Sequence, residues 1–349
     1  MATEVEFSCS MRRRLDTTLK IAVTIAGMAV VLWQVEPEAV ARTLLNVQPA
    51  WLLLSVLLIN IGLFVRAARW LILLRSLQMK LSFWRLLALY YAGNFFNTFL
   101  PTSIGGDVIR VVEVARSMPG GVAAGAVVVD RLTGLLMLFL LALIALPFRP
   151  PTFPESLVPL IGGISFAGLV GGALLLEGTI VRILIRRLTR LFRHPLRRRL
   201  RLRRLLRPLA PTGDTAIARF LNALEALQPH AIAGALATSL LFNLVLTLWW
   251  WAAARSLGFS IPFVYLLLVI PILSISTLVP SIGGLGVREA VAAPLFAALG
   301  GVAGAAIAAE AIGPTLSLLV FLLERLVGFV GAPVYLWLLR REEVDGASS

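Results

Sequence analysis

Charged residues lie inside apolar runs at two places in the chain. Asp130 and Arg131 lie about nine residues into the run 121–147, and Glu324 and Arg325 lie at the matching depth of a later apolar run. A charge near the bilayer centre costs several kcal/mol unless it is paired or faces water, so such residues typically mark substrate or ion pathways. The alternative is that they form structural ion pairs that hold the bundle together.

Neighbouring residues on a helix point about 100° apart, so Asp130 and Arg131 are not expected to pair with each other. Pairing with charges elsewhere in the chain is the better interpretation. The candidate partners are Asp107, Arg110, Arg288 and Glu289.

Two further apolar stretches, 86–100 and 263–279, each run into proline and then Gly-Gly. Proline removes a backbone donor and glycine can turn freely, so helices break there. Freed amides and the start of the next helix suit anionic oxygens, although a tight turn between packed helices is the alternative. The predicted contact residues around these breaks are Asn94, Asn97, Ser103, Gly105, Gly106, Asp107, Arg110, Ser281, Gly283, Gly284, Arg288 and Glu289.

Arg66 and Arg69 lie three residues apart, on one face of a helix, with Trp70 beside them. They are either anchors that extend to the membrane interface or contacts for a lipid headgroup. The cluster Trp249-Trp250-Trp251 is interpreted as an interfacial aromatic belt, with a lipid-facing groove as the alternative.

The elements that must position these residues are membrane helices. The chain of 349 residues is 59% hydrophobic, with a mean hydropathy of +0.90, which is too apolar for a soluble domain. We predict an all-α polytopic membrane protein with about six spanning helices, while 86–100 and 263–279 form re-entrant hairpins. The segment 289–312 is either a short hairpin or a span. The predicted spans are 19–35, 51–74, 121–147, 158–177, 231–254 and 314–339.

Part of the sequence is repeated. The segment from Arg75 to Arg110 returns, altered, from Arg255 to Arg288, and each copy contains one of the two breaks. The pairs Asp130-Arg131 and Glu324-Arg325 follow the two copies in the same order. Such a repeat suggests a transporter built of two related halves, with its site where they meet. The copies differ at one informative position, because Asp107 corresponds to Leu285.

The distribution of basic residues sets the expected topology. Twelve arginines lie between Arg182 and Arg207 without an acid among them, and basic loops stay in the cytoplasm. Counting spans from this loop puts both termini inside and the two copies of the repeat in opposite orientations, as an inverted-topology repeat. The predicted organisation is a tail (1–18), a first membrane repeat (19–177), the arginine-rich loop (178–230), a second repeat (231–340) and a tail (341–349).

The sequence carries no enzyme signature. His/Cys ligand spacings, a Ser-His-Asp set, a Walker loop and a dinucleotide fingerprint are all missing, and Cys9 is the single cysteine. We therefore predict a protein that is not an enzyme, with no cofactor and no metal. The net charge of +14 favours contact with anionic lipid headgroups over nucleic acid, and we expect no nucleic-acid partner.

These motifs, in this order, resemble the lysylphosphatidylglycerol synthase transmembrane-region family, also called flippase-like proteins. The resemblance covers residues 15–340 and rests on Arg66-x-x-Arg69-Trp70, the Gly-Gly break through Arg110, Asp130-Arg131-x-x-Gly134, the second break through Arg288-Glu289, and Arg325. Members fused to an aminoacyl-transferase domain flip the lipid that this domain makes, and stand-alone members are linked to hopanoids and polyprenyl-linked sugars. The transferase domain is missing from this sequence. The resemblance therefore implies translocation of a lipid and not its synthesis.

Three functions follow from these observations. The first is a lipid translocase of a bacterial or archaeal cytoplasmic membrane, which moves a polar or charged headgroup, for example of a phospholipid, through a crevice between the two repeats. The second is a membrane partner of a lipid-modifying or glycosyl-transferring enzyme, docked through the arginine run 182–207. The third is a small-solute or ion-coupled transporter. If the lipid translocase is coupled to an ion, its candidate proton carriers are Asp107, Asp130, Glu310 and Glu324.

Overall fold

A computed structural model describes the chain between residues 37 and 337, with gaps. The described residues are 37–79, 81–99, 105–115, 120–177, 226–279, 281, 285–299 and 308–337. In this part of the chain every regular element is a helix. The α-helices are α2 (Pro37–Leu45), α3 (Pro49–Ser76), α4 (Phe83–Phe99), α5 (Gly105–Ala115), α6 (Gly120–Ala145), α7 (Leu157–Leu176), α11 (Pro229–Ser256), α12 (Phe263–Ser276), α13 (Val287–Phe296) and α14 (Ala309–Phe329).

Five helices of the described residues are long and apolar enough to cross a membrane: α3, α6, α7, α11 and α14 with its extension to Trp337. They match five of the predicted spans, so the prediction of an all-α polytopic membrane protein is confirmed. The predicted span 19–35 lies outside the described residues. Large hydrophobic side chains such as Leu57, Phe166 and Leu241 remain exposed on the outer faces, as expected where lipid is the solvent.

The two predicted hairpins are pairs of short helices. At 1.5 Å per residue, α12 with its 14 residues is about 21 Å long, too short for a hydrocarbon core of about 30 Å. Its partner α13 is shorter still, and α4 and α5 form the other pair. The described parts of 289–312 include the end of α13, a 3₁₀ turn at Ala297–Leu299 and the start of α14, and α13 packs against α14. This segment is therefore not one continuous spanning helix.

The repeat extends further toward the N-terminus than the sequence comparison indicates. Helices α3 and α11 are both 28 residues long, and both begin at a proline that follows a glutamine. Pro49 and Pro229 are 180 residues apart. Past the ends of these helices, Gln78 (φ 63°) and Gly258 (φ 80°) occupy equivalent positions with the same left-handed backbone.

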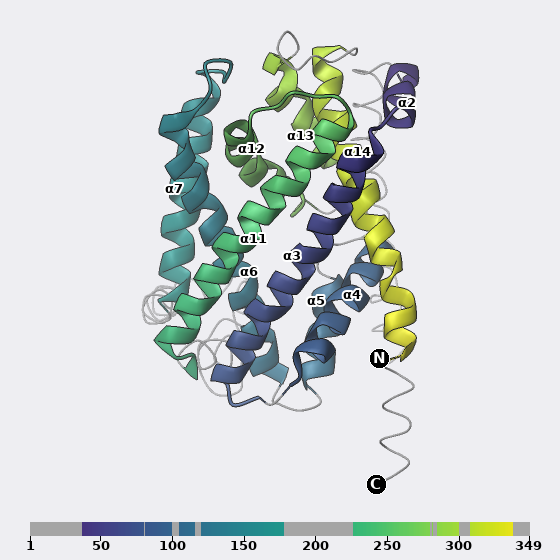
Figure 1. The fold of residues 1–349 in the computed structure, drawn as a ribbon. Coiled ribbons are helices and arrows are strands. Elements are labelled where there is room, and N and C mark those ends of the chain that lie inside the picture. The colour runs from purple at the N-terminus through teal and green to yellow at the C-terminus, as the bar shows by residue number, and fades with distance from the viewer. Residues whose placement is uncertain are drawn as a thin grey trace, which may run out of the picture.

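Helices α3 and α11 pack against each other along their lengths and run antiparallel. Gln48 N donates to Ser256 O at 2.7 Å at one end, and Ser55 Oγ donates to Trp249 O at 3.0 Å further along. Figure 1 shows both helices tilted across the bundle, the α4/α5 hairpin at its lower end, and the α12/α13 hairpin at its upper end. The two copies are therefore inverted relative to each other, as predicted.

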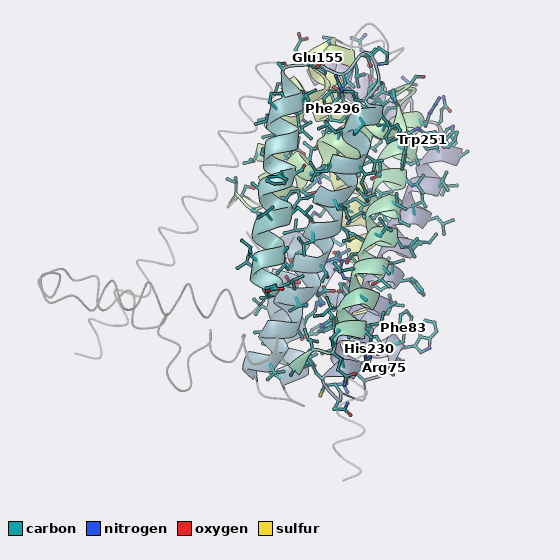
Figure 2. The ribbon with its side chains drawn as sticks, turned by 90° about the vertical axis from the view of Figure 1, so that its left-hand side faces the viewer. Arg75, Phe83, Glu155, His230, Trp251 and Phe296 are labelled. Atoms are coloured by element: carbon teal, nitrogen blue, oxygen red, sulfur yellow. The ribbon has the colours of Figure 1, made fainter. Side chains whose placement is uncertain are left out.

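Labelled side chains also place the two hairpins at opposite ends of the bundle. Figure 2 places Arg75, Phe83 and His230 at one end, and Glu155 and Phe296 at the other. Phe83 opens the first hairpin and Phe296 closes α13 of the second.

Each hairpin packs on a helix of the opposite half. Helix α4 contacts α14, where the rings of Phe96 and Tyr335 meet edge to face at 5.1 Å. Helix α12 correspondingly contacts α6. The two halves are thus interlocked through their hairpins.

Candidate functional site

Asp130 of α6 lies at the centre of a buried group of charges. Its Oδ1 accepts a hydrogen bond of 2.6 Å from Arg69 Nε, and its Oδ2 accepts bonds from Arg110 Nη2 at 3.0 Å and Tyr90 OH at 2.8 Å. Three helices, α3, α4 and α5, therefore direct donors at one carboxylate. The first charge network, as we call it, consists of Arg66, Arg69, Asp107, Arg110, Asp130 and Arg131.

The network continues from Asp130 toward the exterior. Arg110 Nη1 donates to Asp107 Oδ1 at 3.2 Å, and Asp107 Oδ2 pairs with Arg131 Nε. The side chain of Arg131 is 35% exposed and that of Asp107 is 12% exposed, whereas that of Asp130 is only 1% exposed. Charges of alternating sign thus lead from a partly exposed arginine into the bundle.

Arg69 forms the inner end of this chain and joins it to the second half. Its Nη1 donates to Ser239 Oγ of α11 at 2.9 Å. Gly134, one turn after Asp130, provides the room, because a Cβ there would lie 2.9 Å from Arg69 Nη1. The Asp-Arg-x-x-Gly spacing therefore has a physical reason: the acid binds the guanidinium and the glycine makes space for it.

Aromatic rings surround the arginines of the first charge network. The guanidinium of Arg110 lies 4.0 Å from the ring centre of Trp70 and 4.1 Å from that of Tyr90. Arg66 lies 5.0 Å from the Tyr90 ring and 5.5 Å from the Phe242 ring. Cation–π attraction is strongest away from water, so these rings help to hold the cations in an apolar setting.

A second group of charges lies in the other half. Arg288 of α13 donates from Nε to Ser317 Oγ at 2.9 Å, from Nη2 to Ser317 O at 2.8 Å, and from Nη1 to Glu324 Oε2 at 3.5 Å. Glu289 accepts from Ser317 Oγ at 2.9 Å and from Gly286 N at 2.7 Å, and so closes the first turn of α13. The second charge network, as we call it, consists of Arg288, Glu289, Glu324 and Arg325.

The two networks are built around the same combination of residues. Arg288 lies 5.6 Å from the ring centre of Trp250, and Trp250 follows Trp70 by 180 residues. Arg288 is the repeat counterpart of Arg110, and its acid, Glu324, lies at the position that matches Asp130. Each half therefore contains a tryptophan, an arginine and an acid in the same relationship. The sequence analysis matched the arginine and the acid of the two halves but not the tryptophan.

Asn97 and Gly106 connect the two helices of the first hairpin. Gly106 N donates to Asn97 Oδ1 at 2.7 Å, and a Cβ on Gly106 would lie 2.5 Å from Gly93 O. The helices therefore approach backbone to backbone. Asn94 is half-buried in α4, and Ser281 is buried with its Oγ 3.4 Å from Val279 O. Gly105 begins α5, and the predicted contacts Ser103, Gly283 and Gly284 lie outside the described residues.

Two interpretations of the sequence are corrected. Arg69 is 3% exposed and bonded inside the bundle, so it is not an interfacial anchor. Trp249 and Trp250 are 6% and 3% exposed and belong to the core, so an interfacial belt of all three tryptophans is wrong. Only Trp251 remains partly exposed, where it packs edge to face on Trp51 at 5.3 Å.

Sequence reasoning missed three polar residues that form hydrogen bonds with the two charge networks. Tyr90 and Ser317 lie within mostly apolar stretches, and Ser239 lies in the apolar helix α11. Their burial depth was not evident from the sequence. The available signal was that an isolated buried hydroxyl needs a partner.

The arrangement is suited to binding a charged group. Among the described residues, no group of three or more His, Cys, Asp or Glu side chains could hold a metal ion. Adjacent Asp130 and Arg131 contact different partners, as expected from their divergence on a helix. The chemistry present is that of guanidinium donors, carboxylate acceptors and ring faces.

Comparison with known proteins identifies relatives of the whole membrane region. Residues 17–341 match the model of a family described as the lysylphosphatidylglycerol synthase TM region. A UPF0104 membrane protein of Pyrococcus horikoshii is 22% identical over 339 residues, covering 89% of this chain and 92% of the relative. No solved structure matches the chain.

Proposed function

Because this chain belongs to the lysylphosphatidylglycerol synthase transmembrane-region family, we propose that it is a lipid translocase that moves a charged headgroup between leaflets. The observation that carries the proposal is the ordered chain of charges in the first charge network, from partly exposed Arg131 to buried Asp130 and Arg69. A headgroup that enters such a chain exchanges water for fixed charges, while its tails stay in the bilayer. Only the headgroup then needs a polar path.

The charge balance favours an anionic headgroup in the first half. The first charge network contains four arginines and two aspartates, a net charge of +2, while the second charge network contains two arginines and two glutamates and is balanced. Arg66 adds to the excess: among the described residues its guanidinium contacts rings and no carboxylate. Arginine binds phosphate and carboxylate groups through paired N–H donors, so a phosphate-bearing lipid suits this site.

Movement of the headgroup would follow from rocking one half against the other. The interlocked hairpins lie at opposite ends of the bundle and so offer a gate at each end (Figure 1). The sequence has no nucleotide-binding motif, and transport is therefore downhill or coupled to an ion. In this proposal the protein is not an enzyme, and it lies in a bacterial or archaeal cytoplasmic membrane with both termini inside.

Reconstitution into liposomes tests the proposal. The purified protein should expose labelled phospholipids to an external quencher faster than protein-free liposomes do, and Arg131→Ala should abolish this acceleration. Arg131 is a better choice than a buried residue because its side chain is partly exposed and its removal leaves Asp130 paired. Arg149→Ala is the control, because Arg149 pairs with Glu155 outside both networks.

Two results would contradict the proposal that the protein is a lipid translocase. One is uptake of a small solute without movement of any lipid in a broad panel, which indicates a solute transporter. The other is the same lack of lipid movement together with a lipid-modifying enzyme that co-purifies through residues 182–207, which indicates a partner protein.

A further inference from the structure

Asp107 holds a position between two arginines at the outer end of the first charge network. Its Oδ1 accepts from Arg110 Nη1 at 3.2 Å, and its Oδ2 pairs with Arg131 Nε. Exposure of the side chain rises outward, from 2% for Arg110 to 12% for Asp107 and 35% for Arg131. Asp107 is therefore the outermost anion of the network and the first carboxylate that an entering group would meet.

The second half shows that the buried core forms without this acid. There the tryptophan, arginine and acid are Trp250, Arg288 and Glu324, and the position of Asp107 is occupied by Leu285. The additional acid of the second half, Glu289, differs in role, because it binds Gly286 N within its own helix turn. An acid at the position of Asp107 is thus specific to the first half.

Arg110 has a donor that Asp107 does not satisfy. Arg110 Nε is buried and has no hydrogen-bond partner among the described residues, although the side chain is 2% exposed. Each guanidinium carries five N–H donors, whereas one carboxylate has two oxygens. A phosphate group has more acceptor oxygens around one centre than a carboxylate has, so it can bridge the two guanidiniums and offer an oxygen to the unpartnered Nε of Arg110.

We propose that Asp107 is an internal stand-in for the substrate's phosphate, and that an anionic phosphate displaces it from Arg110 and Arg131. In the empty state Asp107 neutralises the two arginines. In the loaded state the phosphate takes its place, and the released carboxylate repels the bound anion, which favours release on the other side. The assignment of this phosphate to a lipid rests on the proposed function.

Binding measured apart from transport tests the proposal. Purified protein is titrated with phosphatidylglycerol, and the lipid-bound fraction is measured by native mass spectrometry. The same titration with the zwitterionic lipid phosphatidylcholine serves as the comparison. Asp107→Asn keeps the side-chain shape and removes the competing charge, so the apparent Kd for phosphatidylglycerol should fall about tenfold, or about 1.4 kcal/mol. Asp107→Leu, which copies the second half, should also bind phosphatidylglycerol more tightly and keeps the test available if the asparagine variant does not fold.

Glu155→Gln is the control, because it removes the same charge from a residue that pairs with Arg149 outside both networks. Its Kd should stay near the wild-type value. Equal or weaker binding by folded Asp107→Asn, while the wild type binds phosphatidylglycerol, overturns the stand-in role and leaves the proposed function intact. A lack of lipid movement in liposomes would contradict the proposed function. A tenfold gain in phosphatidylglycerol binding by Asp107→Asn would still support the role of Asp107.

Inorganic phosphate distinguishes the source of the anion. Thermal unfolding of the wild type and Asp107→Asn is followed with added inorganic phosphate in a zwitterionic detergent. If the lipid is the ligand, phosphatidylglycerol stabilises Asp107→Asn at concentrations where inorganic phosphate has no effect. Stabilisation by inorganic phosphate alone overturns the lipid as the source.

Discussion

Arg69 of the first half donates a hydrogen bond of 2.9 Å to Ser239 of the second half. The same arginine binds Asp130, the centre of the first charge network, at 2.6 Å. A change in the charge network therefore reaches α11 through one guanidinium. Any rocking of the halves must either carry Ser239 along with Arg69 or break this bond.

Replacing Ser239 tests this link. Ser239→Ala removes the acceptor and leaves a buried Arg69 donor unpaired, so the free energy of unfolding should fall by about 1.5–3 kcal/mol. Thermal unfolding in detergent measures the effect. Ser165→Ala is the control, because Ser165 is equally buried but its Oγ has no hydrogen-bond partner among the described residues. Equal losses in both variants would contradict a specific link.

Removing the charge of Asp130 should affect the fold more than the transport step. Asp130→Asn leaves Arg69 as an uncompensated buried cation and leaves Arg110 with Asp107 as its carboxylate partner, and the expected loss of stability is about 3–5 kcal/mol. Denaturant or thermal unfolding provides the measurement. Glu155→Gln breaks the more exposed pair with Arg149 and should cost at most about 1 kcal/mol. A fully stable Asp130→Asn protein would show that the network is not structural.

The space beside Arg69 can be tested at Gly134. In Gly134→Ala the new methyl group lies 2.9 Å from Arg69 Nη1 and pushes the guanidinium off Ser239. We expect a loss of stability of about 1–3 kcal/mol from overpacking, together with slower lipid movement. Gly171→Ala in α7 is the control, because its Cβ meets nothing within 4 Å. If Gly134→Ala is destabilised but moves lipid at the wild-type rate, the space beside Arg69 matters for stability and not for transport.

The inverted arrangement predicts opposite labelling of equivalent loops. Ser82 precedes the first hairpin and Ser260 the second, and both are exposed. In a variant whose native Cys9 is replaced by serine, single cysteines at these two positions should react with an impermeant maleimide from opposite sides of the membrane. Labelling from the same side would contradict the topology.

Much of the fold was predictable because long apolar runs and broken apolar runs have distinct signatures. The spans that include Asp130 and Glu324, and the break before Asp107, followed from hydropathy and from the behaviour of proline and glycine. The burial of Trp250 was not predictable, because an interfacial tryptophan and a core tryptophan have the same local sequence.

The connections within the site were predictable only in part. Divergence on a helix indicated that Asp130 pairs with a distant charge, and Arg110 was among the candidates. Arg69 was not among them, because its position near a helix end also suits an interfacial anchor. Which of two such roles an arginine has depends on the crossing of α3 with α6, a tertiary property.

The crossing of each hairpin onto the opposite half has a consequence for biogenesis. Helix α4 emerges early from the ribosome, but its packing partner α14 is made near the end of synthesis. The face of α4 that carries Phe96 must therefore wait in the membrane without its partner Tyr335 until the last helix inserts. Truncation before α14 should leave an N-terminal fragment that is inserted but recognised by quality-control proteases, however intact its own charges are.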